Sequence, residues 1–423
     1  MDSRGPVGSR VPRLDGAAKA TGAARFVDDL GLPGMLHAAV ARSDRPHARI
    51  RSADVSPATA VPGVVAAATA RDIPGRNVVR IVLDDQPLLA DGVVRYVGEP
   101  IAIVAAEDRR TARAAAAAVA VEYEDLRALL DPRESRGGGI RLFGEDNVFA
   151  RHRIRRGDVE RGLAEADVVV EGEYTTPAQE HAYIEPQGML AAPDPDGGVT
   201  VWGSMQCPFY VQLALCETLG IPRSAARVVQ ATTGGAFGGK EDVPSLVACQ
   251  AALLAVRSGR PVKLIYSREE DIEATSKRHP ARILCRTGAR RDGTLTAARV
   301  EMLYDGGAYA TLSPVVLWRA AVHAVGPYRC PNVSVDAWAV ATNRAPSGAF
   351  RGFGSPQVAF AHESQMDRLA AALGIDPVEM RRRNLLRPGD STATGQILGD
   401  SVGAGETLQR AAEAARWEDR EAG

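Results

Sequence analysis

The chain has 423 residues, of which 45% are hydrophobic and 24% are charged, a composition typical of a globular protein with two or more domains. Its formal net charge of −1 gives no basic field that would hold nucleic acid or an anionic membrane surface. The longest apolar stretches, such as residues 114–121, are too short to span a membrane, and no secretory signal is visible at the N-terminus.

The cysteines are scattered along the chain and form no CxxC pair, which is the spacing typical of structural zinc sites and iron–sulfur clusters. They are Cys207, Cys216, Cys249, Cys285 and Cys330. We therefore expect reduced thiols that hold no metal, and a cytoplasmic location.

Residues 1–13 are polar and predict a disordered N-terminus, followed by an α/β domain over residues 14–125. Residues 100–105 (PIAIVA) form an apolar run of the length of a buried strand. Asp108 then precedes an alanine-rich segment, Arg109–Ala118, which favours a helix capped by this aspartate. Residues 120–123 resume a strand-like pattern, so strand, helix and strand follow one another as in a compact α/β unit.

A loop-like stretch predicts a linker over residues 126–156, and a second domain is expected over residues 157–390. The predicted helices of this domain each end close to a glycine suited to left-handed backbone. They cover residues 208–219, 246–257 and 357–373. The predicted strands cover residues 228–231, 261–266, 281–284 and 295–304. Asp376 is expected to cap one more helix that begins at Pro377.

The segment TTGGAFGGKE, residues 232–241, is the most unusual in the chain. Its glycines let the backbone approach a ligand closely, and successive N–H groups can bind anionic oxygens. The spacing from Gly234 to Lys240 fits a phosphate-binding loop, but that loop continues with Ser or Thr to bind Mg²⁺, whereas Glu241 follows here. This argues against a nucleotide triphosphatase and leaves either a tight turn without a ligand or the resemblance described next.

GGAFGGKE resembles the loop that faces the molybdenum centre in xanthine dehydrogenases and aldehyde oxidases, and further segments match this family in the same order. Those that resemble its N-terminal hammerhead domain are AKATG (18–22), RFVDD (25–29) and VRYVGEP (94–100). Those that resemble its first molybdopterin-binding domain are QEHAYIEP (179–186), GSMQ (203–206), GAY (307–309) and AFRGFG (349–354). The resemblance runs from about residue 12 to residue 415 and implies an α/β (α+β) fold with these two domains, followed by the start of a second molybdopterin-binding domain in residues 391–423.

The resemblance implies hydroxylation of a carbon next to a ring nitrogen, with oxygen drawn from water and two electrons passing to a molybdenum–molybdopterin cofactor. In such an enzyme the metal and pterin carry the redox chemistry, while the protein orients the substrate. The chain looks closest to the molybdenum subunits of bacterial purine-catabolic dehydrogenases. We therefore expect a molybdopterin cytosine dinucleotide here, and 2Fe–2S clusters and FAD on separate partner subunits, an iron–sulfur subunit and a flavin subunit.

Residues that match cofactor-contacting positions of the family are Gln206, Gly235, Phe237, Gly238 and Arg351. Gln206 resembles the glutamine that hydrogen-bonds a molybdenum oxygen, and Phe237 and Gly238 the pair that lies against the oxo ligands. Arg351 would support the cofactor, and none of the five is expected to bind the metal directly. Without the family context, Gln206 reads as a polar strand-end residue and AFRGFG as a strand followed by a packing turn.

Three further residues match substrate-facing positions. Glu241 would hydrogen-bond a purine, and Phe353 would stack on its ring. Arg319 lies where the xanthine enzymes place an arginine that stabilises negative charge developing on the purine. Glu241 and Arg319 are therefore expected to serve catalysis as well as binding, although Arg319 also reads as an ordinary surface arginine.

Glu241 and Arg319 together favour a purine such as hypoxanthine or xanthine over an aldehyde or another nitrogen heterocycle. Carbon monoxide dehydrogenases carry a cysteine in the loop that reads SGAFRGF (347–353) here, so that branch is disfavoured. His181 and Glu185 suggest metal or acid–base chemistry, but the family keeps the HAYIE segment for its fold, so we expect structural roles for both. We likewise expect His279 and His323 to be core or loop residues rather than ligands.

Family molybdenum subunits are usually longer than this sequence. The resemblance implies that the later pterin-binding loops, and the glutamate that acts as general base, are not among these residues. Three interpretations remain: a split subunit completed by a polypeptide that carries the C-terminal half, a truncated product, or a non-catalytic assembly module. We expect the chain alone to hold no molybdenum stably and to lack hydroxylase activity.

Overall fold

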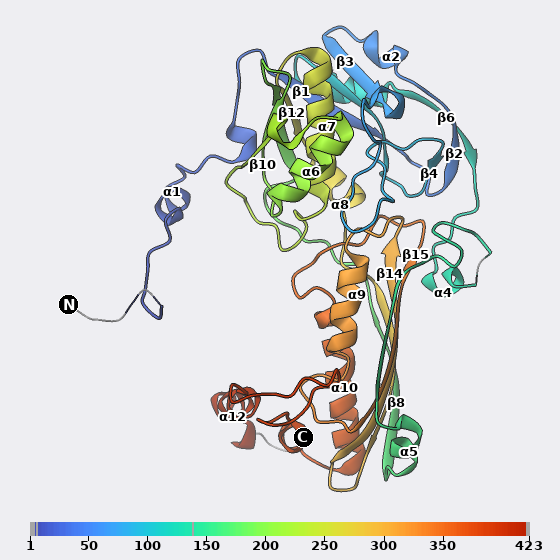
Figure 1. Ribbon diagram of the computed structural model, residues 1–423, viewed down its shortest axis with the longest axis vertical. Coiled ribbons are helices and arrows are strands. Elements are labelled where there is room, and N and C mark those ends of the chain that lie inside the picture. The colour runs from blue at the N-terminus through green and yellow to red at the C-terminus, as the bar shows by residue number, and fades with distance from the viewer. Residues whose placement is uncertain (1–4, 6, 138, 420–423) are drawn as a thin grey trace.

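The computed structural model describes residue 5, residues 7–137 and residues 139–419. Figure 1 shows an upper lobe, an elongated lower lobe and an N-terminal arm that extends away from the upper lobe. Of the segment predicted to be disordered, residues 1–4 and 6 lie outside the described part, and the rest up to Arg13 is exposed and forms neither helix nor strand. The short helix α1, Gly16–Ala20, follows on the arm.

The upper lobe is built on a seven-stranded sheet with the strand order β11-β10-β9-β12-β1-β5-β3. These strands are β1 (Leu36–Arg42), β3 (Val64–Thr69), β5 (Pro100–Ala106), β9 (Gly188–Pro193), β10 (Val199–Gly203), β11 (Ala226–Gln230) and β12 (Val262–Ile265). β1 runs parallel to β12, with Leu36 opposite Val262. The sheet therefore crosses the boundary that the sequence predicts between the two domains.

Helices cover both faces of this sheet, and this explains why β5 is apolar throughout. Ile103 packs on the side of α7 (Val243–Ser258), and Val104 packs on the other side, against α3 (Arg109–Ala117). Asp108 accepts a hydrogen bond from the Thr111 N–H at 2.9 Å, so the predicted cap of α3 is confirmed. Beside the sheet lies a three-stranded sheet of β4 (Val93–Val94), β2 (Ala48–Asp54) and β6 (Ala120–Asp125).

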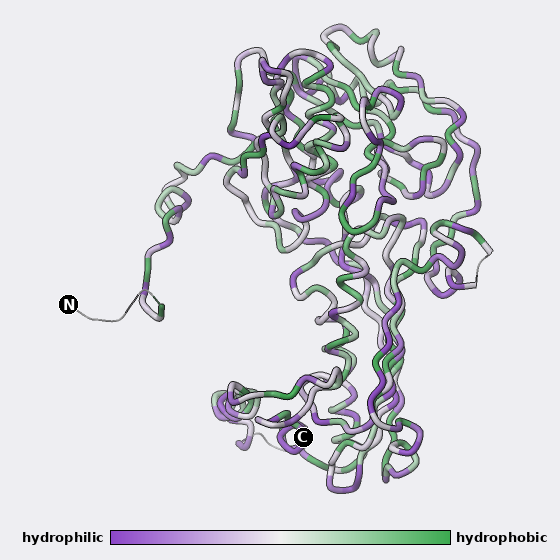
Figure 2. Tube along the Cα trace, viewed as in Figure 1, coloured by the Kyte–Doolittle hydropathy of each residue, from purple (hydrophilic) through white to green (hydrophobic). Residues whose placement is uncertain are grey.

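The lower lobe is a five-stranded sheet with the order β7-β15-β14-β13-β8. Its strands are β7 (Val148–Arg156), β8 (Val168–Thr176), β13 (Ala281–Ala289), β14 (Leu295–Gly307) and β15 (Asn332–Ala341). Helix α9 (Ser313–Val322) packs on β7 and β15, and α10 (Ser355–Leu373) packs on β8 and β13. Hydrophilic and hydrophobic residues alternate along these long strands (Figure 2), as expected of a sheet covered on one face.

The predicted linker is wrong in its last nine residues, because β7 spans Val148–Arg156 and pairs with β15 along its length. Inward and outward positions alternate in β7. Arginines occupy three exposed positions, 151, 153 and 155, and the partly buried position 156. Long arginine stems can cover a sheet while their charged ends stay in water. The basic composition of β7 therefore resembles a loop although its period is that of a strand. Residue 138 of the same predicted linker lies outside the described residues.

The predicted helices of the second domain are confirmed. Helix α6 (Pro208–Leu219), α7 and α10 are each followed by a glycine in left-handed backbone, with φ of 68°, 67° and 65°. Asp376 caps α11 (Pro377–Asn384) by accepting the N–H groups of Val378 and Glu379 at 2.9 Å.

Shorter helices complete the fold. They are α2 (Ser56–Thr59), α4 (Pro132–Ser135), α5 (Val159–Ala164), α8 (Arg268–Ala274) and α12 (Ala404–Ala414). Helix α12 lies beside the foot of the lower lobe (Figure 1), in the segment expected to begin another domain, whose residues 420–423 lie outside the described part. Within the described ranges, no helix has the length and apolar character that a membrane crossing requires.

Candidate active site

A cavity of about 540 Å³ lies where the two lobes meet, between the loop that follows β11 and the segments around α9 and α10. It is lined by Gln206, Phe237, Gly238, Glu241, Arg319, Phe350, Arg351, Gly352 and Phe353. Segments that are far apart in sequence thus bring together most of the predicted site residues. Gly235 is the exception, because it does not line the cavity: a Cβ placed there would lie 3.1 Å from the Cβ of Tyr183.

Gln206 holds the glycine-rich loop through its amide oxygen. Its Oε1 accepts hydrogen bonds from the Gly238 N–H at 3.0 Å and the Lys240 N–H at 3.3 Å. The backbone N–H of Gln206 donates to the Lys240 carbonyl at 2.7 Å. Because the loop occupies the oxygen, the amide N–H₂ group is the end of this exposed, cavity-lining side chain that is left to donate.

Lys240 is an internal anchor of the same loop. Its side chain is fully buried and pairs with Glu185, whose Oε2 lies 3.0 Å from Nζ. Nζ also donates to the Glu185 carbonyl at 2.7 Å and to the Ser204 Oγ at 2.8 Å. Burial lowers the pKa of Lys240, while the Glu185 carboxylate acts in the opposite direction. A lysine held in this way does not point at a phosphate in the cavity, which agrees with the argument against a nucleotide-binding loop.

The second loop of the cavity, residues 349–354, is joined to the first by its backbone. The Arg351 N–H donates to the Phe237 carbonyl at 2.8 Å. A Cβ on Gly238 would lie 2.7 Å from the Ala349 carbonyl oxygen, so this contact requires glycine. Phe237 and Phe353 both have left-handed backbone, with φ of 55° and 52°. Such strain in bulky residues is characteristic of sites where geometry serves function.

Glu241 and Arg319 give the cavity two polar groups of different kinds. Glu241 precedes α7 and is half-buried, and burial, with a smaller contribution from Asp242, raises the pKa of its carboxyl. It therefore keeps its proton to a higher pH than an exposed glutamate does. Arg319 projects from α9, with its Cζ 5.6 Å from the centre of the Phe353 ring. A flat molecule stacked on Phe353 would thus meet a cation and a carboxyl group that can donate.

The histidines and acids of the HAYIE segment support these loops. His181 is buried and its Nε2 lies 2.7 Å from the Ala349 carbonyl oxygen, while Glu185 is the partner of Lys240. His279 is buried against the Ser313 Oγ at 2.8 Å. Among the described residues no group of three or more His, Cys, Asp or Glu is arranged to hold a metal ion. These contacts agree with the structural roles expected for all three residues.

Sequence reasoning assigned no role to two cavity residues, Phe350 and Gly352. Both lie inside the AFRGFG motif, and their place in this motif is the sequence feature that could have identified them. Four consecutive residues of the motif, 350–353, line the cavity. The anchoring role of Lys240 was also missed, because a lysine after two glycines suggests an exposed phosphate ligand rather than a buried cation.

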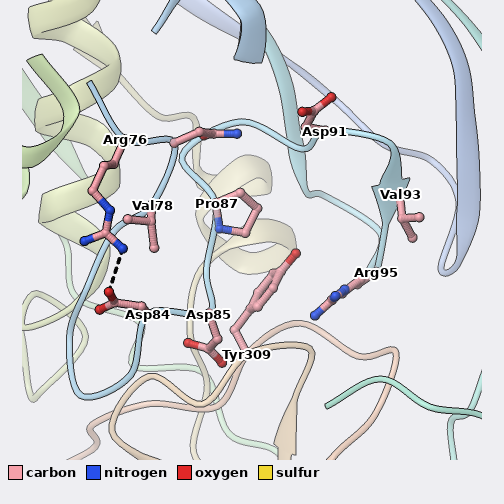
Figure 3. Close-up of a pocket in the computed structure, with 10 residues that line it drawn as sticks. Arg76, Val78, Asp84, Asp85, Pro87, Asp91, Val93, Arg95 and Tyr309 are labelled. Atoms are coloured by element: carbon pink, nitrogen blue, oxygen red, sulfur yellow. Dashed lines mark hydrogen bonds and ion pairs between the residues drawn. The ribbon is translucent and has the colours of Figure 1, made fainter. Parts of the chain in front are cut away.

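A larger cavity, of about 640 Å³, lies elsewhere, between residues 76–95 of the upper lobe and Tyr309. Figure 3 shows Arg76 paired with Asp84 on one side and Arg95 on the other, with Tyr309 between them. The Arg76–Asp84 distance is 2.7 Å. None of the predicted site residues lines this cavity. The smaller cavity is therefore the candidate active site, although its volume is not the larger of the two.

The five cysteines are free thiols in the described residues, and three of them are buried. Burial raises the pKa of Cys249 and of Cys285 to about 12, and the pKa of Cys207 to about 11. Thiols that stay protonated at neutral pH are poor nucleophiles and poor metal ligands.

Comparison with known proteins identifies a family for each of two regions. A family described as "Aldehyde oxidase and xanthine dehydrogenase, a/b hammerhead domain" matches residues 21–127, and "Molybdopterin cofactor-binding domain" matches residues 143–385. The nicotinate dehydrogenase large molybdopterin subunit of Eubacterium barkeri is 43% identical over 410 residues, which cover 97% of this chain and 96% of that protein.

Two other relatives are longer than this chain. A protein of Bacillus subtilis named as a probable xanthine dehydrogenase component is 42% identical over 95% of this chain and 53% of its own length. The structure of the aldehyde oxidoreductase from Desulfovibrio gigas superposes with a TM-score of 0.91 and 32% identity, covering 98% of this chain and 48% of that one. The chain thus spans nearly all of one relative and about half of the other two.

Proposed function

Because this chain belongs to the xanthine dehydrogenase and aldehyde oxidase family, as a molybdopterin-binding subunit, we propose that it forms the substrate-facing part of an enzyme that hydroxylates a nitrogen heterocycle. The first candidate is a purine, hypoxanthine or xanthine. The observation that carries this proposal is the cavity that Glu241, Arg319 and Phe353 line together, with the Arg319 Cζ 5.6 Å from the centre of the Phe353 ring. Ring nitrogens and carbonyl oxygens of a purine offer hydrogen-bonding partners to both polar groups, and offset stacking on Phe353 suits a flat ring.

The donors of this cavity fit a molybdenum–molybdopterin group. The Gln206 amide, whose oxygen is already bound by the loop, and the exposed Arg351 guanidinium supply N–H groups that suit oxo and anionic oxygens. Phe237, with 48% of its surface exposed, would cover one side of the group. When bound, the cofactor supplies the two-electron oxidation and the water-derived oxygen. We further propose that its pterin carries a cytosine dinucleotide, as the resemblance to bacterial purine dehydrogenases implies.

The residues of this chain would bind and orient the substrate. Arg319 would stabilise negative charge that develops on the heterocycle, because a fixed guanidinium in a partly closed cavity needs little reorganisation. Glu241, with its raised pKa, would donate a hydrogen bond to a ring nitrogen or carbonyl while protonated and accept one when ionised. Phe353 would fix the plane of the ring. These are roles in binding and electrostatic stabilisation, and we assign proton abstraction to none of them.

A second candidate substrate is a pyridinecarboxylate. The observation that favours it is the relative of nearly equal length, which is named a nicotinate dehydrogenase. A ring carboxylate would pair with Arg319 as an anion, whereas a purine would present neutral groups to the same guanidinium. The aldehyde group is a single carbonyl and offers Glu241 and Arg319 fewer partners than a purine edge does, so an aldehyde is the weaker alternative.

We propose that polypeptide beyond these residues completes the site, in the same chain or in another. Large apolar side chains next to the cavity residues support this, because they are exposed although such surfaces usually pack against a partner. They are Phe209 (81% exposed) and Trp318 (51%). Two relatives are about twice as long as the matched region. The free, separated cysteines do not supply the grouped thiolates that a 2Fe–2S cluster needs, and they fit a reducing compartment such as the cytoplasm. We therefore propose the 2Fe–2S clusters on one partner subunit, and FAD on another as the family resemblance implies.

The test of substrate class uses the completed enzyme. Arg319→Met and Glu241→Ala are each expected to lower kcat/KM for xanthine by about a hundredfold, the usual effect of removing one transition-state donor, and to change aldehyde turnover far less. Arg286→Met, which breaks an exposed pair with Glu171 on the far sheet, is the control and should change neither. Equal losses on xanthine and on an aldehyde would contradict the purine assignment.

A comparison of nicotinate with its neutral amide, nicotinamide, distinguishes the pyridinecarboxylate from the purine as the substrate. If the substrate is nicotinate, the wild-type enzyme should prefer it to the neutral nicotinamide, and Arg319→Met should abolish that preference while xanthine is not turned over at all.

Purification of the chain alone, followed by metal analysis and a xanthine assay, tests its dependence on the rest of the enzyme. Substantial activity from the chain alone would overturn that dependence, and a loaded complex that oxidises no heterocycle would favour the assembly module.

A further inference from the structure

One buried histidine touches both loops of the cavity. The Nε2 edge of His181 lies 2.7 Å from the Ala349 carbonyl oxygen in the second loop. The opposite edge packs on the glycine-rich loop, where a Cβ on Gly239 would lie 2.8 Å from the ring Nδ1. Gly239 therefore has to be glycine for the ring to fit.

The face of the same ring holds Phe350. The rings of His181 and Phe350 are stacked, with centroids 4.3 Å apart and planes inclined by 19°. Arg278 covers Phe350 as well, with its Cζ 3.9 Å from the ring centroid. The guanidinium of Arg278 also donates to the Arg351 carbonyl at 3.2 Å and to the Gln179 Oε1 at 2.9 Å. Phe350 is thus held by a stacked imidazole and a cation, and its neighbour Arg351 is fixed by the same arginine.

The hydrogen bond of His181 defines its tautomer. The Ala349 carbonyl only accepts, so Nε2 carries the proton and donates it. Nδ1 then carries a lone pair, and it lies buried against Gly239 without a hydrogen-bond donor among the described residues. The Glu180 carboxylate lies 4.0 Å from Nδ1, but burial lowers the pKa of His181 and favours the neutral ring, which has one edge bound to the second loop and the other packed on the first.

We propose that His181, Phe350 and Arg278 form a positioning clamp that fixes the second loop against the glycine-rich loop and so sets where Arg351 and Phe353 stand in the cavity. The clamp acts through the junction at which the Arg351 N–H donates to the Phe237 carbonyl, 2.8 Å away. His181 and Arg278 do not line the cavity, so their effect on a substrate passes through the loops. The clamp does not depend on which heterocycle is bound.

Hydrogen exchange of the Arg351 amide, measured on the full chain, reports directly on this junction. His181→Phe keeps the stacked ring but leaves the Ala349 carbonyl without its donor, and it is expected to speed this exchange about tenfold, as loss of one buried hydrogen bond does. His181→Gln keeps an N–H near the position of Nε2, and should restore most of the protection. His47→Phe is the matched control, because it removes a histidine hydrogen bond to the Arg127 carbonyl far from the cavity.

The exchange of helix α7 separates positioning from general loss of structure. We expect the loops at residues 235–239 and 349–354 to exchange faster in His181→Phe while α7 keeps its wild-type rate. In the completed enzyme, the same variant should lower kcat/KM for the heterocycle, and His181→Gln should recover it.

Two results would overturn the clamp. One is an Arg351 amide that exchanges at the wild-type rate in His181→Phe, and the other is an α7 that loses protection in parallel with the loops. If His181→Phe does not fold, Phe350→Leu and Arg278→Lys decide in its place, since each removes one contact of the clamp and should speed the same exchange. Because this readout needs neither cofactor nor substrate, failure of the proposed function would leave it standing.

Discussion

Replacing Lys240 with methionine removes a cation from the buried anchor of the glycine-rich loop and keeps a side chain of similar length. In the native protein Lys240 is fully buried and Glu185 is 12% exposed. Without the lysine, Glu185 Oε2 keeps the Ser204 hydroxyl at 2.6 Å and the Gly234 N–H at 2.7 Å, but it loses its countercharge. The variant therefore buries a carboxylate that is hydrogen-bonded but electrostatically unpaired.

Breaking a buried ion pair from one side costs about 3–5 kcal/mol, and we expect Lys240→Met to lower the free energy of unfolding by this amount. The second substitution Glu185→Gln removes the stranded charge, so the double variant should be more stable than Lys240→Met alone. This gain in stability from the second substitution is the distinctive part of the prediction, because two independent losses of stability would add and make the double variant the least stable. An exposed pair provides the scale: Arg282→Met, which breaks the contact with Glu173, should cost less than about 1 kcal/mol.

Urea unfolding followed by circular dichroism, on the wild type, both single variants and the double variant, gives the required cycle. A loss below about 1 kcal/mol for Lys240→Met would mean that the pair is solvated and the anchor is weak. A double variant less stable than either single variant would also refute the reasoning. It would show that shape and hydrogen bonds, rather than the charge, hold the loop.

Two further predictions concern packing and pH. Gly238→Ala places a Cβ 2.7 Å from the Ala349 carbonyl and 2.9 Å from the Phe350 Cα, at a φ of 107°, so we expect a loss of roughly 2–4 kcal/mol in thermal unfolding; an unchanged melting temperature would show that the two loops are not in close contact. Burial raises the pKa of Glu99 from 4.5 to about 7, although Tyr309 donates to it. The stability contributed by its neutral form is present below pH 4.5 and lost as the pH rises through 7. Between these limits Glu99→Gln should gain about 3 kcal/mol relative to the wild type, and a difference in unfolding free energy that does not vary with pH would contradict this.

Local patterns in the sequence predict much of the upper lobe and a long helix of the lower lobe, because the signals lie within a few residues of the elements they define. The apolar run of β5, the cap at Asp108 and the glycines that end α6, α7 and α10 each act locally, and all are confirmed. Strand β7 was missed because its outward arginines hide a period of two. The pairing of β1 with β12 has no local signal at all, since the partners are separated by more than two hundred residues.

The sequence motifs predict most of the residues that line the candidate site, but they do not predict the residues that hold its loops in place. The motifs name residues that line the cavity, and the structure places Gln206, Glu241 and Arg319 together. They say nothing of the side chains behind the loops, because a buried lysine and an exposed one are the same letter in a sequence. The roles of Lys240 and His181 depend on contacts with residues that are distant in the chain, and such contacts become visible only in three dimensions.

The parallel pairing of β1 with β12 has a consequence for synthesis of the protein. Residues 36–42 leave the ribosome long before residues 262–265, so one edge of β1 has no partner while the residues between them are made. An unpaired, largely apolar strand edge invites pairing with other chains. A nascent chain that stalls before β12 would expose this edge, and a chaperone that shields it until Val262 emerges would raise the yield of folded protein.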